Sequence, residues 1–156
     1  MTTNNLFFED LTIGQKFKSG IASVDEHLIQ EFGSQYDPQP FHTNKELAKN
    51  TFFKGLVASG WHTAAITMRL LVQSNLKLAG GLIGAGIDEL RWPISVYPGD
   101  ELHLDIEIIE TKRSASKPNR GFAKIKVLTK NQNEVVVMSY VATLVVEIKN
   151  NYKNLV

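Results

Sequence analysis

The chain has 156 residues, of which 17 are Lys or Arg and 16 are Asp or Glu, and it contains no Cys. This length predicts one domain with its own core, and the lack of Cys excludes disulfides and thiol catalysis. The formal charge of +1 offers no overall attraction to nucleic acid or to an anionic membrane, so neither is an expected partner.

The first residues lack the basic start and the apolar core of a signal peptide. The most apolar run, residues 135–146, is too short for a membrane-spanning helix. We therefore expect a cytoplasmic protein.

A strand and two short helices are expected in the first third of the chain, with the strand near residues 16–24. The Ser-Val-Asp-Glu sequence at residues 23–26 fits a capping box, with a hydroxyl at the N-cap and a carboxylate three residues later. It predicts a helix over residues 25–34. The Thr-Asn-Lys-Glu sequence at residues 43–46 repeats this pattern and predicts a second helix directly after His42.

Between these helices, residues 37–42 read Asp-Pro-Gln-Pro-Phe-His. The two prolines should hold the segment as a stiff, non-helical strap, which makes Asp37 and His42 a preset acid/base pair. Both should address one water from the same subunit, about one hydrogen-bonded water apart. The alternative is that Asp37 only caps a turn and His42 only precedes a helix, because Asp and Pro are ordinary turn residues.

Residues 60–76 carry apolar side chains at helical spacing and predict the only long helix, covered on most of its circumference. Gly80 and Gly81 are expected to stop it. The glycine-rich run 80–86 follows a helix and enters a strand, whereas a dinucleotide loop follows a strand and opens a helix. We therefore interpret the run as helix termination and close backbone packing.

The remainder of the chain predicts antiparallel strands. Residues 101–108 alternate apolar and polar side chains, residues 121–129 do the same, and residues 135–148 are apolar on nearly both faces. Residues 97–100 and 130–133 supply the turns.

This order of elements predicts an α+β protein in which one helix lies across a curved sheet of about four long strands. A strand that is apolar on both faces needs a further cover, most simply a second copy of the chain, so we expect a homodimer or higher homo-oligomer. We expect a single domain over residues 1–148 and a loose polar tail over residues 149–156.

The strap, the turn at Ser59 and Gly60, the apolar helix and the strand series resemble the MaoC-like dehydratases of the hotdog fold, which include the (R)-specific enoyl-CoA hydratases. The family motif D-x-N-P-x-H matches residues 37–42, with Gln39 in place of Asn. Residues 96–100 resemble the V-x-x-G-D turn of the family. The resemblance covers nearly the whole chain and implies a curved antiparallel sheet wrapped around one long central helix.

The resemblance implies reversible addition of water to a 2-enoyl-CoA, or to an enoyl-acyl carrier, to give the 3-hydroxyacyl thioester. Asp37 and His42 would activate water and move the proton at the α-carbon. The backbone N–H of Gly60 would face the thioester oxygen, where an amide at a helix N-terminus stabilises an enolate. A branched residue at Gly60 should leave the fold intact. We expect further substrate contacts from the residues around this site, which are Gln39, Phe41, Ser59, Trp61 and His62.

No metal or redox cofactor is expected, because coenzyme A or the pantetheine of a carrier would arrive with the substrate and the histidines lack metal-ligand spacing. His103 should be solvent-exposed on a polar strand face, and His27 lies in a polar helix turn. Residues 112–121 concentrate four cations. They predict a solvated hairpin or, as an alternative, a contact to the phosphates of coenzyme A.

Two other functions fit the same fold. A carboxylate and a water could hydrolyse the thioester, which would make the protein an acyl-CoA thioesterase. The pocket could also bind acyl thioesters without turnover.

Overall fold

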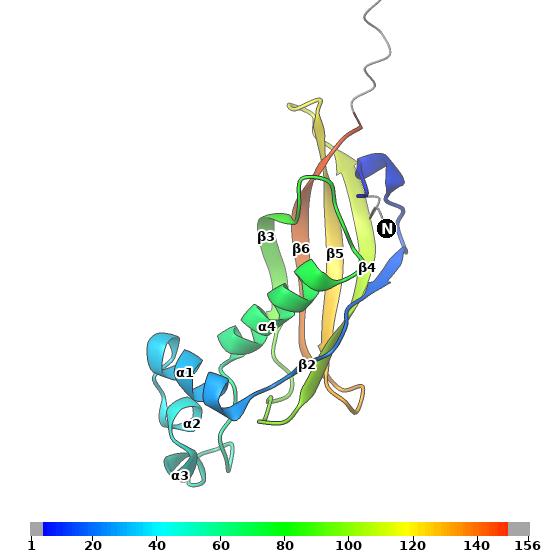
Figure 1. The fold of residues 1–156 in the computed structure, drawn as a ribbon. Helices are drawn as coiled ribbons and strands as arrows, with labels where there is room; N and C mark the ends of the chain where they lie inside the picture. Colours follow the sequence, from blue (N-terminus) through cyan, green and yellow to red (C-terminus); the bar gives the residue numbers. More distant parts are fainter. Residues whose placement is uncertain (1–4, 150–156) are drawn as a thin grey trace, which may run out of the picture.

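A curved antiparallel sheet with one long helix lying across it forms the body of the protein (Figure 1). The computed structural model describes residues 5–149. The strands are β1 (Lys16–Lys18), β2 (Ala22–Ser23), β3 (Ile83–Arg91), β4 (Glu101–Arg113), β5 (Arg120–Lys130) and β6 (Val136–Glu147). The helices are η1 (Phe8–Asp10), α1 (Glu26–Tyr36), α2 (Pro40–Thr43), α3 (Lys45–Ala48) and α4 (Gly60–Gln73). The expected α+β class is confirmed.

The sheet has the strand order β1-β4-β5-β6-β3, and β2 also pairs with β4. All pairs are antiparallel. The three late strands expected from the sequence are therefore confirmed as β4, β5 and β6, which form its centre. Strand β3 pairs with β6 alone among the described strands, so it leaves one open edge.

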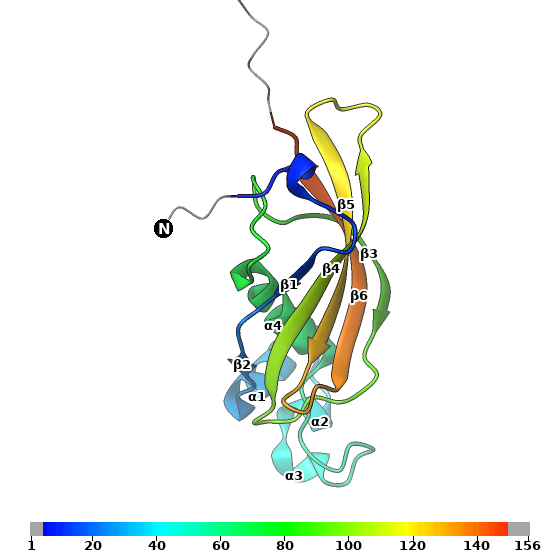
Figure 2. The same cartoon turned by 90° about the vertical axis from the view of Figure 1, so that its right-hand side faces the viewer.

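Helix α4 covers one face of the sheet, as Figure 2 shows from the side. The alternation in β4 turns Leu102, Leu104 and Ile108 toward this helix, and all three are fully buried. Burial of each such side chain contributes about 1.5–3 kcal/mol. The hydroxyls of Thr67 in α4 and Thr129 in β5 lie 2.7 Å apart in the buried interface between helix and sheet, so one donates a hydrogen bond to the other away from water.

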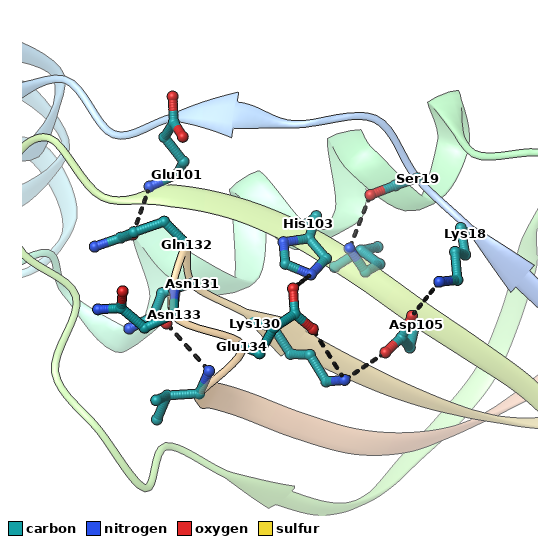
Figure 3. A network of polar contacts seen from close by, with 12 residues as sticks. Lys18, Ser19, Glu101, His103, Asp105, Lys130, Asn131, Gln132, Asn133 and Glu134 are labelled. Atoms are coloured by element: carbon teal, nitrogen blue, oxygen red, sulfur yellow. Dashed lines mark hydrogen bonds and ion pairs between the residues drawn. The ribbon is translucent and has the colours of Figure 1, made fainter.

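The opposite face of the sheet carries a chain of alternating charges (Figure 3). Lys130 lies 2.6 Å from Asp105 and 3.5 Å from Glu134, and Lys18 lies 3.9 Å from Asp105. His103 lies 2.9 Å from Glu134, in the turn between β5 and β6, and its side chain is only 22% exposed. His103 thus lies on the polar strand face as expected, but its side chain is only partly exposed because it pairs with Glu134.

Helix α4 differs from its expected form at its end and on its outer side. It ends at Gln73, where the Ser74 N–H and hydroxyl both donate to Leu71 O. Gly80 and Gly81 adopt positive φ in a later turn, so they do not stop the helix. In the single chain Met68 and Val72 are about half exposed, so the expectation of a helix covered on most of its circumference is wrong here.

Helices α1 and α3, which correspond to the two helices expected in the first third of the chain, begin later than their capping boxes predicted. Ser23 is used in β2, where it pairs with Glu101, and Asp25 caps α1 instead by accepting from Leu28 N–H at 2.9 Å. Asn44 caps α3 in place of Thr43. Ser, Thr, Asp and Asn all cap well, so neighbouring candidates cannot be ranked by type alone.

Lys149, the first residue of the expected tail, is held by the rest of the chain. Its N–H donates to Glu9 at 3.1 Å and its Nζ lies 2.5 Å from Asp10. The rest of that tail, residues 150–156, lies outside the described residues. Within residues 5–149 no helix combines the length and the hydropathy needed to cross a bilayer.

Candidate active site

Asp37 and His42 lie against each other at the junction of α1 and α2. Asp37 is the C-cap of α1, and His42 lies inside α2, whose first residue is Pro40. Proline suits the first position of a helix, because its missing N–H has no intrahelical partner there. The expectation of a strap without helix is therefore wrong. The short helical turn brings His42 Nε2 within 3.2 Å of Asp37 Oδ2, so the pair is in direct contact and not one water apart.

A backbone carbonyl fixes the orientation of the buried His42 ring. Its Nδ1 lies 2.7 Å from Val57 O, and because a carbonyl can only accept, we assign a proton to Nδ1. Nε2 therefore faces Asp37 and can either hold or accept the second proton. Gly33 of α1 makes this packing possible, since a Cβ there would meet His42 O at 2.6 Å.

Two side chains donate hydrogen bonds to the carboxylate of Asp37, one to each oxygen. Gln39 Nε2 donates to Oδ1 at 2.7 Å, and Ser59 Oγ donates to Oδ2 at 2.7 Å. Burial raises the pKa of Asp37, but these two hydrogen bonds and the adjacent His42 outweigh it, so its pKa lies below the usual value. Asp37 is therefore ionised at neutral pH.

Helix α4 begins beside this pair. Ser59 is its N-cap and accepts from the Trp61 N–H, while Gly60 is its first residue. Among residues 5–149 no hydrogen bond occupies the Gly60 N–H, which is a first-turn donor of the helix. A Cβ at Gly60 would meet the Trp92 ring at 2.8 Å. A branched residue at position 60 would therefore need Trp92 to shift, and the expectation that such a variant stays folded remains a prediction.

Asp37, His42 and Gly60 line one cavity of about 400 Å³. Its aromatic walls are Phe41 and Phe53, whose ring centroids lie 5.0 Å apart, and Trp61 and Trp92, whose ring centroids lie 5.2 Å apart. Of the other expected contact residues, Gln39, Phe41 and Trp61 line the cavity.

Ser59 and His62 are not among the residues that line this cavity. The hydroxyl of Ser59 is directed to Asp37 instead. His62 lies on another side of α4, where its ring stacks on Phe32 with centroids 4.9 Å apart. Burial, and to a lesser degree Arg69, lowers the pKa of His62.

The cationic hairpin of residues 112–121 lies at the end of the sheet opposite α1, α2 and α3 (Figure 1). Arg113 is bound there by Glu9 at 3.0 Å and lies over the Phe8 ring. In the described part of the single chain, no residue of this hairpin lines the cavity. The expected phosphate contact therefore has no support within one subunit.

Sequence reasoning missed Val57, Gly33 and Trp92. Val57 acts through its carbonyl, so its side chain gives no signal. Gly33 in the middle of α1 was a usable signal, because glycine inside a helix costs about 1 kcal/mol and marks close packing.

A model of the MaoC like domain family matches residues 9–132. An uncharacterized protein of Bacillus subtilis, YdeM, is 30% identical over 129 residues, which cover 83% of this chain and 90% of that protein.

Solved structures agree with this match. A MaoC-like dehydratase from Rhodospirillum rubrum is 47% identical with a TM-score of 0.89, covering 93% of this chain and 99% of that chain. An (R)-hydratase from Pseudomonas aeruginosa shares the fold, with 24% identity, a TM-score of 0.71 and coverage of 93% and 91%. A Mycobacterium tuberculosis protein described as a double hotdog fold is 16% identical with a TM-score of 0.80, covering 98% of this chain and 47% of that one. The hotdog fold expected from the sequence is confirmed.

Proposed function

Because the chain belongs to the MaoC-like domain family, we propose that it is a hydratase or dehydratase of acyl thioesters. It would add water reversibly to a 2-enoyl-CoA or enoyl-acyl carrier and give the 3-hydroxyacyl thioester. The observation that carries this proposal is the direct Asp37–His42 pair in one cavity with the N-terminus of α4.

The pair has the properties that proton transfer to and from substrate requires. Asp37 is held as a carboxylate, and His42 Nε2 beside it can give or take a proton. Such acid/base groups contribute about 10²–10⁴-fold to turnover. The free N–H of Gly60 provides a donor for negative charge, strengthened by the dipole of α4.

In the hydration direction, the pair removes one proton from a water molecule while the water oxygen bonds to the β-carbon. The electrons of the carbon–carbon double bond move toward the thioester, and the resulting enolate oxygen faces the Gly60 N–H. A proton is then delivered to the α-carbon, which completes the addition of water. Dehydration follows the reverse path.

This reaction needs no metal or redox cofactor, because each step moves only a proton and an electron pair of the substrate. Coenzyme A, or the pantetheine of an acyl carrier, would enter with the acyl group. The aromatic walls of the cavity suit the apolar acyl chain.

We further propose that the active form is at least a dimer. In the single chain Met68 and Val72 on α4 and Ile83 and Ile87 on β3 are 45–60% exposed, and Met68 and Ile87 line the same pocket. Strand β3 also has an open edge. A second copy would cover both, since exposed edges and apolar patches favour association.

Crotonyl-CoA provides the decisive test. Loss of the enoyl absorbance with an intact thioester is the expected result. Release of free thiol would favour a thioesterase, which the fold also supports. Saturable binding with neither change would favour a non-catalytic acyl-thioester binding module.

A further inference from the structure

Ser59 is a buried serine whose single hydroxyl makes two hydrogen bonds. The side chain belongs to a residue that is 1% exposed. Its Oγ lies 2.7 Å from Asp37 Oδ2 and 3.3 Å from the Trp61 nitrogen. A carboxylate can only accept and a backbone N–H can only donate, so the hydroxyl proton must be directed to Asp37. The orientation of this hydroxyl is therefore fully determined.

The hydroxyl links two parts of the site that the backbone does not link directly. Asp37 follows the last residue of α1, while Ser59 precedes Gly60, the first residue of α4. The other groups on the Asp37 carboxylate come from Gln39 and His42, in the same short segment as the acid. Among the described contacts, Ser59 is the one that connects Asp37 to the helix that presents the Gly60 N–H.

We propose that Ser59 is a positioning residue, which holds the Asp37 carboxylate at a fixed separation from the Gly60 N–H. This inference rests on the proposed function. It replaces the expected substrate contact, because Ser59 does not line the cavity and its proton is already committed to Asp37. The low pKa of Asp37 agrees with it, since the Ser59 hydroxyl is among the groups that lower that pKa.

The competing explanation is that Ser59 serves only as the N-cap of α4. Ser59→Gly separates the two roles, because glycine is tolerated at an N-cap almost as well as serine whereas the bond to Asp37 is lost completely. Ser59→Cys tests the same point with little change in volume, because the thiol is a weak donor. Ser74→Ala is the matched control, since Ser74 is a 2%-exposed serine that caps the other end of the same helix.

The experiment measures the pH dependence of crotonyl-CoA hydration, together with the titration of the Asp37 carboxylate by carbon-13 NMR. For Ser59→Gly we expect kcat to fall about 10- to 100-fold with KM nearly unchanged, which corresponds to a lost hydrogen bond to a charged group. The acid limb of the rate profile and the Asp37 titration should both move to higher pH. Ser59→Cys should shift both in the same direction but less far, and Ser74→Ala should shift neither.

An Asp37 titration that stays at the wild-type pH in both folded Ser59 variants would overturn the proposal. A rise in KM with unchanged kcat would also overturn the proposal, because it would indicate that Ser59 contacts the substrate instead. If the wild type does not hydrate crotonyl-CoA, the proposed function fails. The NMR titration then still decides whether the Ser59 hydroxyl influences the protonation of the Asp37 carboxylate.

Discussion

The indole of Trp92 lies directly on the backbone of Gly60. Its Nε1 donates to Gly60 O at 3.0 Å, and a Cβ built at Gly60 would come within 2.8 Å of the ring. The packing against Trp92 therefore favours glycine at position 60, which also lines the cavity.

Gly60→Ala should lower the free energy of unfolding by about 1–3 kcal/mol, the usual cost of overpacking. Urea denaturation measures this. Gly20→Ala is the control, because a Cβ at Gly20 meets nothing within 4 Å. In a Trp92→Ala background, Gly60→Ala should cost much less; an equal cost in both backgrounds would show that Trp92 is not the obstacle.

Asp37→Asn should reduce kcat about 10²–10⁴-fold, because the amide cannot take a proton from water. The crotonyl-CoA assay measures this directly. Asp25→Asn is the matched control: Asp25 caps α1 outside the cavity, and Asn caps a helix as well as Asp does. Turnover of Asp37→Asn at the wild-type level would remove Asp37 from the mechanism.

Because of the ion pair between Asp105 and Lys130, the free energy of unfolding should depend on pH in the acid range. The hydrogen bond from Lys130 is the largest cause that lowers the pKa of Asp105. A carboxyl with a lowered folded pKa stabilises the protein above its unfolded pKa, and this contribution is lost as the pH falls through the folded pKa. Because both side chains are partly exposed, the effect should not exceed about 1 kcal/mol.

Lys130→Met checks this by urea unfolding at about pH 7 and about pH 3, on either side of the ordinary Asp pKa. The variant should be less stable than the wild type at the higher pH, and the difference should shrink at the lower pH. A difference that stays constant with pH would mean that Lys130 acts through packing of its aliphatic stem.

Sedimentation should give a mass at least twice the 17.4 kDa of one chain at micromolar concentration. Met68→Lys should shift the equilibrium toward monomer, because it places a charge in the apolar surface on α4. The exposed position of Met68 in the single chain means that the monomer itself should stay folded. Lys126→Met, on the other face of the sheet, is the control. A wild type that sediments as a single chain would contradict the dimer.

The alternating strands were predictable because apolar residues at every second position mark the buried face, as Leu102 and Leu104 do in β4. The Asp37–His42 contact was predictable in outline from the proline-containing motif. Its direct geometry was not, because proline is compatible with a strap and equally with the first position of a helix such as α2. Contacts made by the backbone, such as Val57 O on His42, have no sequence pattern at all.

The hydrogen bonds from Lys149 to Glu9 and Asp10 bring the last described residue beside η1, near the start of the described chain. Figure 1 places this junction at the end of the sheet far from α1, α2 and α3. Chains whose ends lie close together tolerate circular permutation. A linker across this junction, with new ends opened in an exposed turn, should therefore reproduce the same cavity. The contacts between the elements would be the same in such a permutant, although the elements would follow one another in a different order along the chain.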